Sequence, residues 1–364
     1  MKSMKKTTIA LFFLGAIVLG LSYLYFFRPE PEETRVLKVY CAGSLLYPLE
    51  RVAEEFMNEY PHIELHIEGH GSIQVIRHPV ELDDPADLLL VADYSLIPLM
   101  MYDAPVPDRD VNYTDWYIRF AGNEMVLAYT DQSLHVGTID ESNWYDILEM
   151  DDVKLGISNP IIDALGYRAL ILLQLAEFYY DESRIFEDVL GTWFEPEFES
   201  VDIGERTIIF VPEEERPIGE KISVRASSVQ LIPLLQSGAI DYAFLYKSNV
   251  EQQGFPYMEL PDEINLGNNE HDDFYEQAQV RFQHARFQTI GLDRLGRTIY
   301  YGMTISETAE NPDDAVLLAE FILNGEGKRI FTDLYHPVYE PSYTDNLEGV
   351  PEELRQYLTQ EIYK

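Results

Sequence analysis

The clearest indication of the fold class is a stretch near the start of the chain, Val36-Leu37-Lys38-Val39-Tyr40-Cys41-Ala42-Gly43-Ser44. Its mostly apolar first half predicts a short strand, and Ala42-Gly43-Ser44 predicts a turn. After the turn, apolar residues recur every three or four positions from Leu46 to Tyr60, which is typical of an amphipathic helix. Ser44 is a good N-cap for this helix, and Pro61 ends it. The first unit is therefore a strand, a turn and a helix.

The same unit returns further along the chain. Residues 63–67 alternate apolar with charged or histidine side chains, as a half-buried strand does, and a second turn follows. Strands that alternate with helices predict an α/β fold with parallel sheets. Small or hydroxyl-bearing residues begin a helix at four junctions, which are Ala42-Gly43-Ser44, Gly69-His70-Gly71-Ser72, Asp163-Ala164-Leu165-Gly166 and Ala226-Ser227-Ser228.

These four junctions indicate a binding site for an anion. The turns after parallel strands lie at the edge of the sheet where ligands bind. Helix N-termini present free N–H groups and a partial positive charge, and serine adds a neutral O–H donor. A single serine of this kind is most simply a helix cap. The prediction therefore depends on whether the four junctions converge.

The composition excludes several classes of protein. The chain has 364 residues, with 26 Lys and Arg against 64 Asp and Glu, a formal net charge of −38. A hydrophobic fraction of 46% excludes a disordered acidic polymer, and the length suggests two domains. Nucleic-acid binding needs clustered cations, so we expect this acidic chain not to bind nucleic acid. The single cysteine, Cys41, allows neither an internal disulfide nor a cysteine zinc site. The dispersed carboxylates suit a saline habitat, although an ordinary acidic surface explains them equally well.

The N-terminus predicts a membrane anchor. Three lysines lie among the first eight residues, and the uncharged apolar run from Ile9 to Phe27 is long enough to cross a bilayer as a helix. The lysines before it predict a cytoplasmic N-terminus and an extracytoplasmic remainder, on the cell membrane. A cleaved signal remains the alternative, in which case the protein would be secreted. Residues 28–35 form an acidic, proline-containing linker.

Beyond the linker, seven segments follow one another in an order that is specific to a known family: residues 39–45, 69–72, 91–98, 121–126, 158–168, 237–248 and 260–267. Together they resemble the molybdate/tungstate-binding proteins of ABC importers in their archaeal form. The resemblance covers roughly residues 36 to 340 in the same order. A lone Ala-Gly-Ser would be weak evidence for this family, whereas the ordered series of segments is specific evidence.

The resemblance implies the α/β, two-lobed type II fold of periplasmic binding proteins, with two chain crossovers and a ligand cleft between the lobes. We place the crossovers near Ala121 and Tyr257. Lobe 1 then comprises residues 36–121 and 257–345, lobe 2 comprises 122–256, and 346–364 is a C-terminal helix or tail.

The resemblance also implies the site residues. The family's serine ligands fall on Ser44, next to Gly43, and on Ser72, and its tyrosine ligand falls on Tyr246. Its aspartate and neighbouring backbone donors fall on Asp163, Ala164 and Leu165. Where the archaeal form has a metal-coordinating glutamate, this chain has Ser228.

That departure points to a tetrahedral anion held by hydrogen bonds rather than to six-fold metal coordination. Ser228 offers its N–H and hydroxyl, and Asp163 is expected to cap its own helix, although it stays a possible direct ligand. A molybdate or tungstate dianion has four acceptor oxygens and nothing to donate, which fits a set of donors.

We therefore expect an extracytoplasmic receptor for molybdate or tungstate, a monomer that delivers the anion to an ABC permease. It would be no enzyme and would use no cofactor. One alternative is the same fold binding sulfate or another tetrahedral oxyanion. Another is a surface-anchored serine hydrolase that uses Ser72 and His70. Arg168 and Lys247 are either charges beside the cleft or surface salt bridges. The clustered histidines 62, 66, 70 and 78 could suggest a metal site, but 62, 66 and 70 alternate with apolar residues on a strand and are expected to face solvent.

Overall fold

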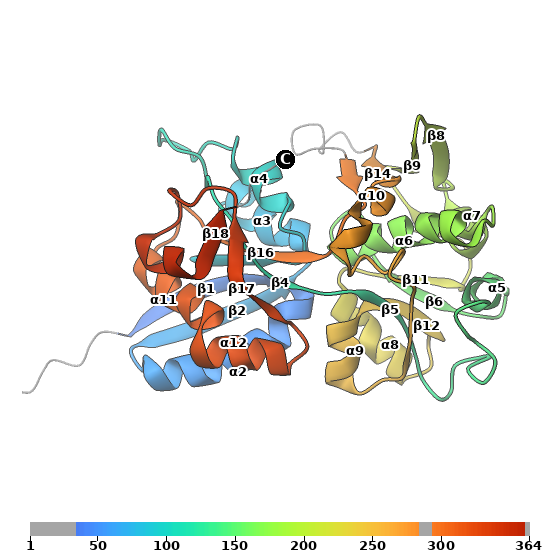
Figure 1. The fold of residues 1–364 in the computed structure, drawn as a ribbon, viewed down its shortest axis with the longest axis horizontal. Coiled ribbons are helices and arrows are strands. Elements are labelled where there is room, and N and C mark those ends of the chain that lie inside the picture. The colour runs from blue at the N-terminus through green and yellow to red at the C-terminus, as the bar shows by residue number, and fades with distance from the viewer. Residues whose placement is uncertain (1–33, 284–292, 361–364) are drawn as a thin grey trace, which may run out of the picture. The chain divides into compact units, whose positions relative to one another are not determined.

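The computed structural model describes residues 34–283 and 293–360 (Figure 1). The described residues from Val36 onward form one compact unit. The predicted anchor at 9–27 lies outside the described residues. Among the residues that are described, no helix is both long and apolar enough to span a bilayer.

The first lobe is built on a sheet of seven strands in the order β18-β17-β4-β16-β3-β1-β2. These strands are β1 (Arg35–Ala42), β2 (Ile63–His70), β3 (Leu88–Val91), β4 (Ile118–Gly122), β16 (Tyr300–Ile305), β17 (Val338–Thr344) and β18 (Leu358–Gln360). Its helices are η1 (Gly43–Leu45), α2 (Leu46–Glu59), α3 (Ser72–Glu81), α4 (Leu96–Met101), α11 (Pro312–Leu323), α12 (Gly325–Asp333) and η6 (Glu352–Tyr357).

The second lobe is built on a sheet of five strands in the order β11-β6-β12-β5-β13. These are β5 (Met125–Tyr129), β6 (Leu155–Ser158), β11 (Ile222–Arg225), β12 (Tyr242–Tyr246) and β13 (Tyr257–Glu259). The helices of this lobe are α5 (Trp144–Glu149), α6 (Ala164–Tyr180), α7 (Ile185–Val189), η2 (Gly191–Trp193), η3 (Ser228–Leu231), α8 (Ile232–Gln236), α9 (Lys247–Gln253), η4 (Asn269–His271) and α10 (Asp272–Tyr275).

A further sheet of four strands, in the order β15-β14-β9-β8, packs on α6 from the other side. Its strands are β8 (Glu199–Ile203), β9 (Arg206–Val211), β14 (Ala278–Phe282) and β15 (Asp293–Leu295), and a small pair joins β7 (Phe194–Glu195) to β10 (Arg216–Pro217). Every residue of α6 from Ala164 to Ala176 is buried, because a sheet covers each side of the helix. A helix that is buried on all sides has no solvent-exposed face, so its sequence lacks a stripe of charged residues.

The sheets are mixed, whereas alternation of strands and helices predicted parallel ones. Strand β16 runs antiparallel to β3 and β4, and β5 runs antiparallel to β12 and β13. Both β5 and β16 bring the chain in from the other lobe. Because such a strand needs no crossover helix, it can enter its sheet in the opposite direction.

The chain passes from the first lobe to the second between β4, which ends at Gly122, and β5, which begins at Met125. The return lies later in the chain than Tyr257. Tyr257 lies on β13 inside the second lobe, and the chain rejoins the seven-stranded sheet at β16. Residues 346–360 add the 3-10 helix η6 and the edge strand β18 to the first lobe, in the region where a C-terminal helix or tail was expected.

Candidate functional site

The four polar junctions meet where the two lobes face each other. A Cβ atom at Gly43 would lie 3.6 Å from Ser227 Cβ in the fourth junction. A Cβ atom at Gly71 would lie 2.2 Å from the carbonyl oxygen of Ile162, beside the third. Gly71 is therefore required by the close approach of another backbone. The convergence on which the anion prediction depended is present in the structure.

Three buried hydroxyls form the centre of this region. Ser44, Ser72 and Tyr246 are each at most 1% exposed. Ser44 Oγ accepts a hydrogen bond from the Tyr301 hydroxyl (3.0 Å), and Ser72 Oγ accepts one from the Ala92 N–H (3.0 Å). Tyr246 Oη accepts one from Arg168 Nη1 (2.7 Å). Each oxygen thus has an internal donor, which leaves its own proton to be donated elsewhere.

Ser44 and Ser72 are not the helix caps that their positions suggested. Ser44 lies inside η1, and α2 has Leu45 at its N-cap with no capping bond from a side chain. Ser72 is the first residue of α3, after the N-cap Gly71. Because neither hydroxyl is used to end a helix, both remain available at the junction.

Asp163 joins two of the turns. It is the N-cap residue of α6, so Ala164 and Leu165 supply the first N–H groups of that helix. Its carboxylate accepts a hydrogen bond from the Ser228 N–H (3.0 Å), which is therefore engaged within the protein and not aimed at a ligand. Of the two donors predicted for Ser228, the hydroxyl is the one that this bond leaves available.

Burial dominates the electrostatics of Asp163, which is 3% exposed. Removal from water raises the pKa of this carboxyl to about 6, against the opposing effects of the Ser158 hydroxyl, the Ser228 N–H and the Arg168 charge. The carboxyl is consequently much easier to protonate than an exposed aspartate. Protonation removes the repulsion that a bare carboxylate would exert on a dianion.

Arg168 is the buried cation of the site. It is 2% exposed, and besides Tyr246 its Nη1 donates to the Ala92 carbonyl of the first lobe (2.8 Å). Its Nη2 lies 3.9 Å from Asp93 Oδ2, which also accepts from the Tyr167 hydroxyl (2.6 Å). Arg168 therefore orients Tyr246 and links the two lobes. From here on, Ser44, Ser72, Asp163, Ser228, Tyr246 and Arg168 are called the interlobe site.

Lys247 has the other role considered for it, a partly exposed salt bridge. Its Nζ lies 2.7 Å from Glu124 Oε1 and 2.9 Å from Glu259 Oε1, and its side chain is 29% exposed. The sequence context distinguishes the two cations. Arg168 is surrounded by apolar residues on a helix without a polar face, so its charge had to be buried and paired.

Tyr301 was missed by the sequence analysis. It is fully buried on β16, and its hydroxyl donates to Ser44 and accepts from Asn123 Nδ2 (2.9 Å). The available signal was the pair Tyr300-Tyr301 on a strand. Side chains alternate along a strand, so one of the two had to face inward and find a polar partner for its hydroxyl.

The structure does not support a serine hydrolase that pairs Ser72 with His70. The His70 ring packs against Tyr40 and His78, with ring centroids 5.4 and 4.5 Å away, and its Nε2 lies 3.4 Å from Glu68. Burial lowers the pKa of His70. Within the described ranges, no group of three or more His, Cys, Asp or Glu side chains is arranged to hold a metal ion.

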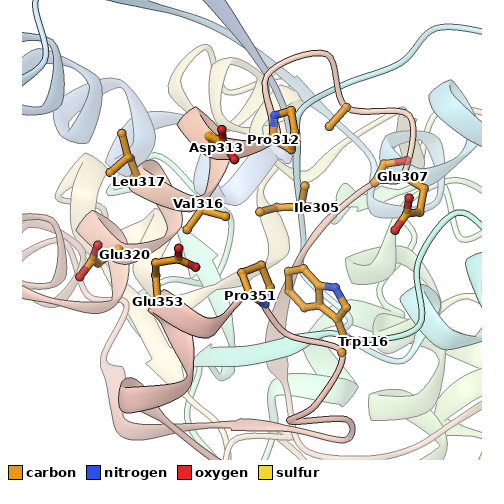
Figure 2. Close-up of a pocket in the computed structure, with 13 residues that line it drawn as sticks. Trp116, Ile305, Glu307, Pro312, Asp313, Val316, Leu317, Glu320, Pro351 and Glu353 are labelled. Atoms are coloured by element: carbon orange, nitrogen blue, oxygen red, sulfur yellow. The ribbon is translucent and has the colours of Figure 1, made fainter.

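A separate cavity of about 510 Å³ lies in the first lobe, and Figure 2 shows its lining. We call it the Trp116 pocket. Apolar residues of β16 and α11 line it together with Trp116, and the carboxylates of Glu307, Asp313, Glu320 and Glu353 surround it. None of the described residues that line it is basic. Its chemistry is thus opposite to that of the interlobe site and unsuited to an anion.

Comparisons with known proteins agree with this architecture. A family model for bacterial extracellular solute-binding proteins matches residues 37–334. A molybdate/tungstate-binding protein of Thermococcus kodakarensis is 33% identical over 331 residues, covering 89% of this chain and 87% of that protein. An uncharacterized solute-binding protein of Methanococcus maripaludis is 36% identical over 327 residues, which are 89% of this chain and 92% of that protein.

A solved structure gives the same result for the fold. The periplasmic molybdate-binding protein of Azotobacter vinelandii matches with a TM-score of 0.54 at 16% identity, over 84% of this chain and 100% of that one. At this identity the likeness concerns the fold alone, which is the two-lobed α/β fold of periplasmic binding proteins.

Proposed function

This chain belongs to the family of bacterial extracellular solute-binding proteins, and on that premise we propose that it binds molybdate or tungstate at the interlobe site and delivers it to an ABC importer. The relative from Thermococcus kodakarensis is named for these two anions. The ligand is the oxyanion itself, and no cofactor or catalytic step is part of the proposal.

The observation that carries the proposal is the direction of the three hydrogen bonds at the buried hydroxyls. Ser44, Ser72 and Tyr246 all accept from inside the protein, so all three protons can point at a ligand. A ligand that meets three O–H donors must be rich in acceptors, and a dianion with four oxygens satisfies them all. Hydrogen bonds to a charged partner contribute roughly 1.5–3 kcal/mol each, so this set supports tight binding.

Two features favour a tetrahedral anion held by hydrogen bonds. Ser228 brings no carboxylate to the site, and Asp163 already accepts from the Ser228 N–H. A metal centre would thus find at most one carboxylate, from a group that burial makes easy to protonate. X-ray absorption on bound molybdate distinguishes four coordinating oxygens from six.

Binding is proposed to couple to closure of the lobes. Ser44 and Ser72 come from the first lobe, whereas Asp163, Ser228 and Tyr246 come from the second. An anion that contacts both sets of donors favours the closed arrangement over any in which they are apart. We place the binding domain outside the cytoplasm. The apolar segment 9–27 would anchor it to the membrane, or cleavage of that segment would release it.

The test is calorimetric titration of the full-length chain, in mild detergent, with molybdate, tungstate and sulfate at matched salt. We expect a Kd below about 1 µM for molybdate and tungstate, with sulfate far weaker. Tight sulfate binding would favour the alternative ligand, and binding of none of the three would refute the proposal.

Variants connect that result to the site. Ser44→Ala is expected to lose about 1–3 kcal/mol of binding free energy, because a donor to a buried anion is removed. Ser142→Ala is the matched control, since that exposed hydroxyl bonds only within its own loop, to Asp140. Equal affinities for the two variants would exclude Ser44 from the site.

A further inference from the structure

A chain of three hydrogen-bonding side chains connects the crossover between the lobes to the interlobe site. Asn123, between β4 and β5, donates from Nδ2 to Tyr301 Oη (2.9 Å), and Tyr301 donates to Ser44 Oγ (3.0 Å). Tyr301 is fully buried and Ser44 is 1% exposed. Ser44 is therefore connected to the segment that joins the lobes.

The neighbours of Asn123 fix the direction of this chain of bonds. Asn123 Oδ1 accepts from the Glu124 N–H (3.0 Å) and from the Ser248 N–H (3.4 Å). Asn123 Nδ2 donates to Ser248 Oγ (2.7 Å) as well as to Tyr301. With its oxygen facing two N–H groups, the amide can present only donors to Tyr301. The tyrosine oxygen accepts, and its proton goes to Ser44.

Tyr301 stays a donor throughout the physiological pH range. Burial raises the pKa of its hydroxyl to about 12, against the opposing effects of Ser44, Asn123 and Arg168. The Ser44 oxygen then accepts one hydrogen bond from Tyr301, and the serine keeps its own proton free to donate. A serine without this partner could turn its proton toward the tyrosine and present a lone pair to the ligand, which would repel an anion.

We propose that Tyr301 is a positioning residue of the oxyanion site, which receives a hydrogen bond from Asn123 at the crossover and orients the Ser44 hydroxyl toward the bound anion. This inference rests on the proposed function and deepens it. Asn123 also holds Ser248, which lies two residues after the site residue Tyr246. One amide thus holds side chains from both lobes, so the orientation of Ser44 depends on the arrangement of the crossover.

The tyrosine ring has a separate packing role, which a phenylalanine preserves. Its centroid lies 6.1 Å from that of Tyr246 and 5.3 Å from that of His336. Tyr301→Phe keeps these contacts and removes only the hydroxyl. It also leaves Asn123 with its bonds to Ser248, so the crossover keeps most of its hydrogen bonds.

The experiment is a double-mutant cycle read by molybdate calorimetry on the full-length chain. Tyr301→Phe is expected to weaken binding roughly 5- to 10-fold, and Ser44→Ala roughly 10- to 100-fold. In the Ser44→Ala background, Tyr301→Phe is expected to change the affinity by less than about 2-fold, because the group through which it acts is gone. A merely structural role would weaken both backgrounds equally.

Tyr300→Phe is the matched control on the same strand. Its ring lies against Arg119 instead, 4.0 Å from the guanidinium carbon, so its loss of a hydroxyl should leave affinity unchanged. If Tyr301→Phe does not fold, Asn123→Ala replaces it in the cycle and removes the donor that sets the direction of the bonds.

The outcomes separate this inference from the proposed function. If the wild type binds molybdate and Ser44→Ala weakens it, but Tyr301→Phe has no effect or the same effect in both backgrounds, the positioning role is overturned and the function stands. If the wild type binds neither molybdate nor tungstate, the function itself fails and this role with it. If Tyr301→Phe weakens molybdate binding in the wild type but not in the Ser44→Ala background, the result supports both the positioning role and the proposed function.

Discussion

The interlobe site and the Trp116 pocket belong to one chain of net charge −38, yet their chemistry is opposite. The interlobe site has buried hydroxyls, a buried guanidinium and one carboxyl whose pKa burial raises. The Trp116 pocket has an apolar lining and four carboxylates around it. An acidic protein can therefore be an anion receptor, because a buried site responds to its own donors while surface charges are screened by salt.

Arg168→Met removes the buried cation that distinguishes the interlobe site, and it should have the largest effect. Asp93, which is 4% exposed, would lose the guanidinium that lies 3.9 Å from its carboxylate. Removing one member of a buried ion pair typically costs about 3–5 kcal/mol in the free energy of unfolding. Tyr246 would also lose the donor that orients it, so molybdate affinity should fall. Urea unfolding and calorimetry measure the two effects.

Lys247→Met is the matched control for this variant, because its ion pairs with Glu124 and Glu259 are partly exposed. A partly exposed pair should contribute at most about 1 kcal/mol. Equal destabilisation by the two variants would contradict the distinction between a buried cation of the site and a surface one.

Asp163→Asn tests whether the site contains a carboxyl that resists ionisation. The folded-state pKa of about 6 lies above that of an unfolded aspartate, so the folded chain binds more protons between about pH 4 and pH 6. The stability contributed by this group is full below that window and is lost as the pH rises through it. Between pH 4 and pH 7, the free energy of unfolding of the variant should therefore rise relative to that of the wild type by up to about 3 kcal/mol.

This gain is measured as the difference between the urea unfolding free energies of variant and wild type, without ligand, at each pH. Asp140→Asn is the control of opposite sign, since hydrogen bonds from Ser142 lower the pKa of that exposed carboxyl. A difference for Asp163→Asn that is constant with pH would show that its carboxyl ionises normally.

Ser72→Ala makes the interlobe site more like the Trp116 pocket by removing one donor. We expect a loss of about 1–3 kcal/mol in molybdate binding, because the anion loses an O–H and the Ala92 N–H loses its acceptor. Ser237→Ala is the control, since this exposed hydroxyl bonds to Leu234 at the end of α8. Unchanged calorimetry for Ser72→Ala would remove this serine from the donor set.

The smallest effect is expected in the Trp116 pocket itself. Glu320→Gln combined with Glu353→Gln removes two of its carboxylates. Molybdate affinity should change by less than about 0.5 kcal/mol at physiological salt, because distant exposed charges are screened. A clear rise in affinity that disappears at high salt would show that the acidic surface does act on the interlobe site.

Much of the fold could be predicted, because its signals are local. The strand, turn and helix at residues 36–60 follow from periodicity, and α2 ends within one residue of the prediction. Strand β14 shows where local signals end, because it is largely buried against α6 although Gln279 and Arg281 lie on it. A covering helix from another part of the chain leaves no periodic mark on the strand that it covers.

For the site, sequence alone supplied the residue types and their places at four junctions, since turn chemistry and helix starts are written in neighbouring residues. It could not supply the partners that give each group its function. The Tyr301 hydroxyl meets Ser44 across 257 positions, and Arg168 meets Tyr246 across 78. Which proton a hydroxyl has free, and whether a charge is buried, depend on such contacts. They exist only once each lobe has folded and brought these distant positions together.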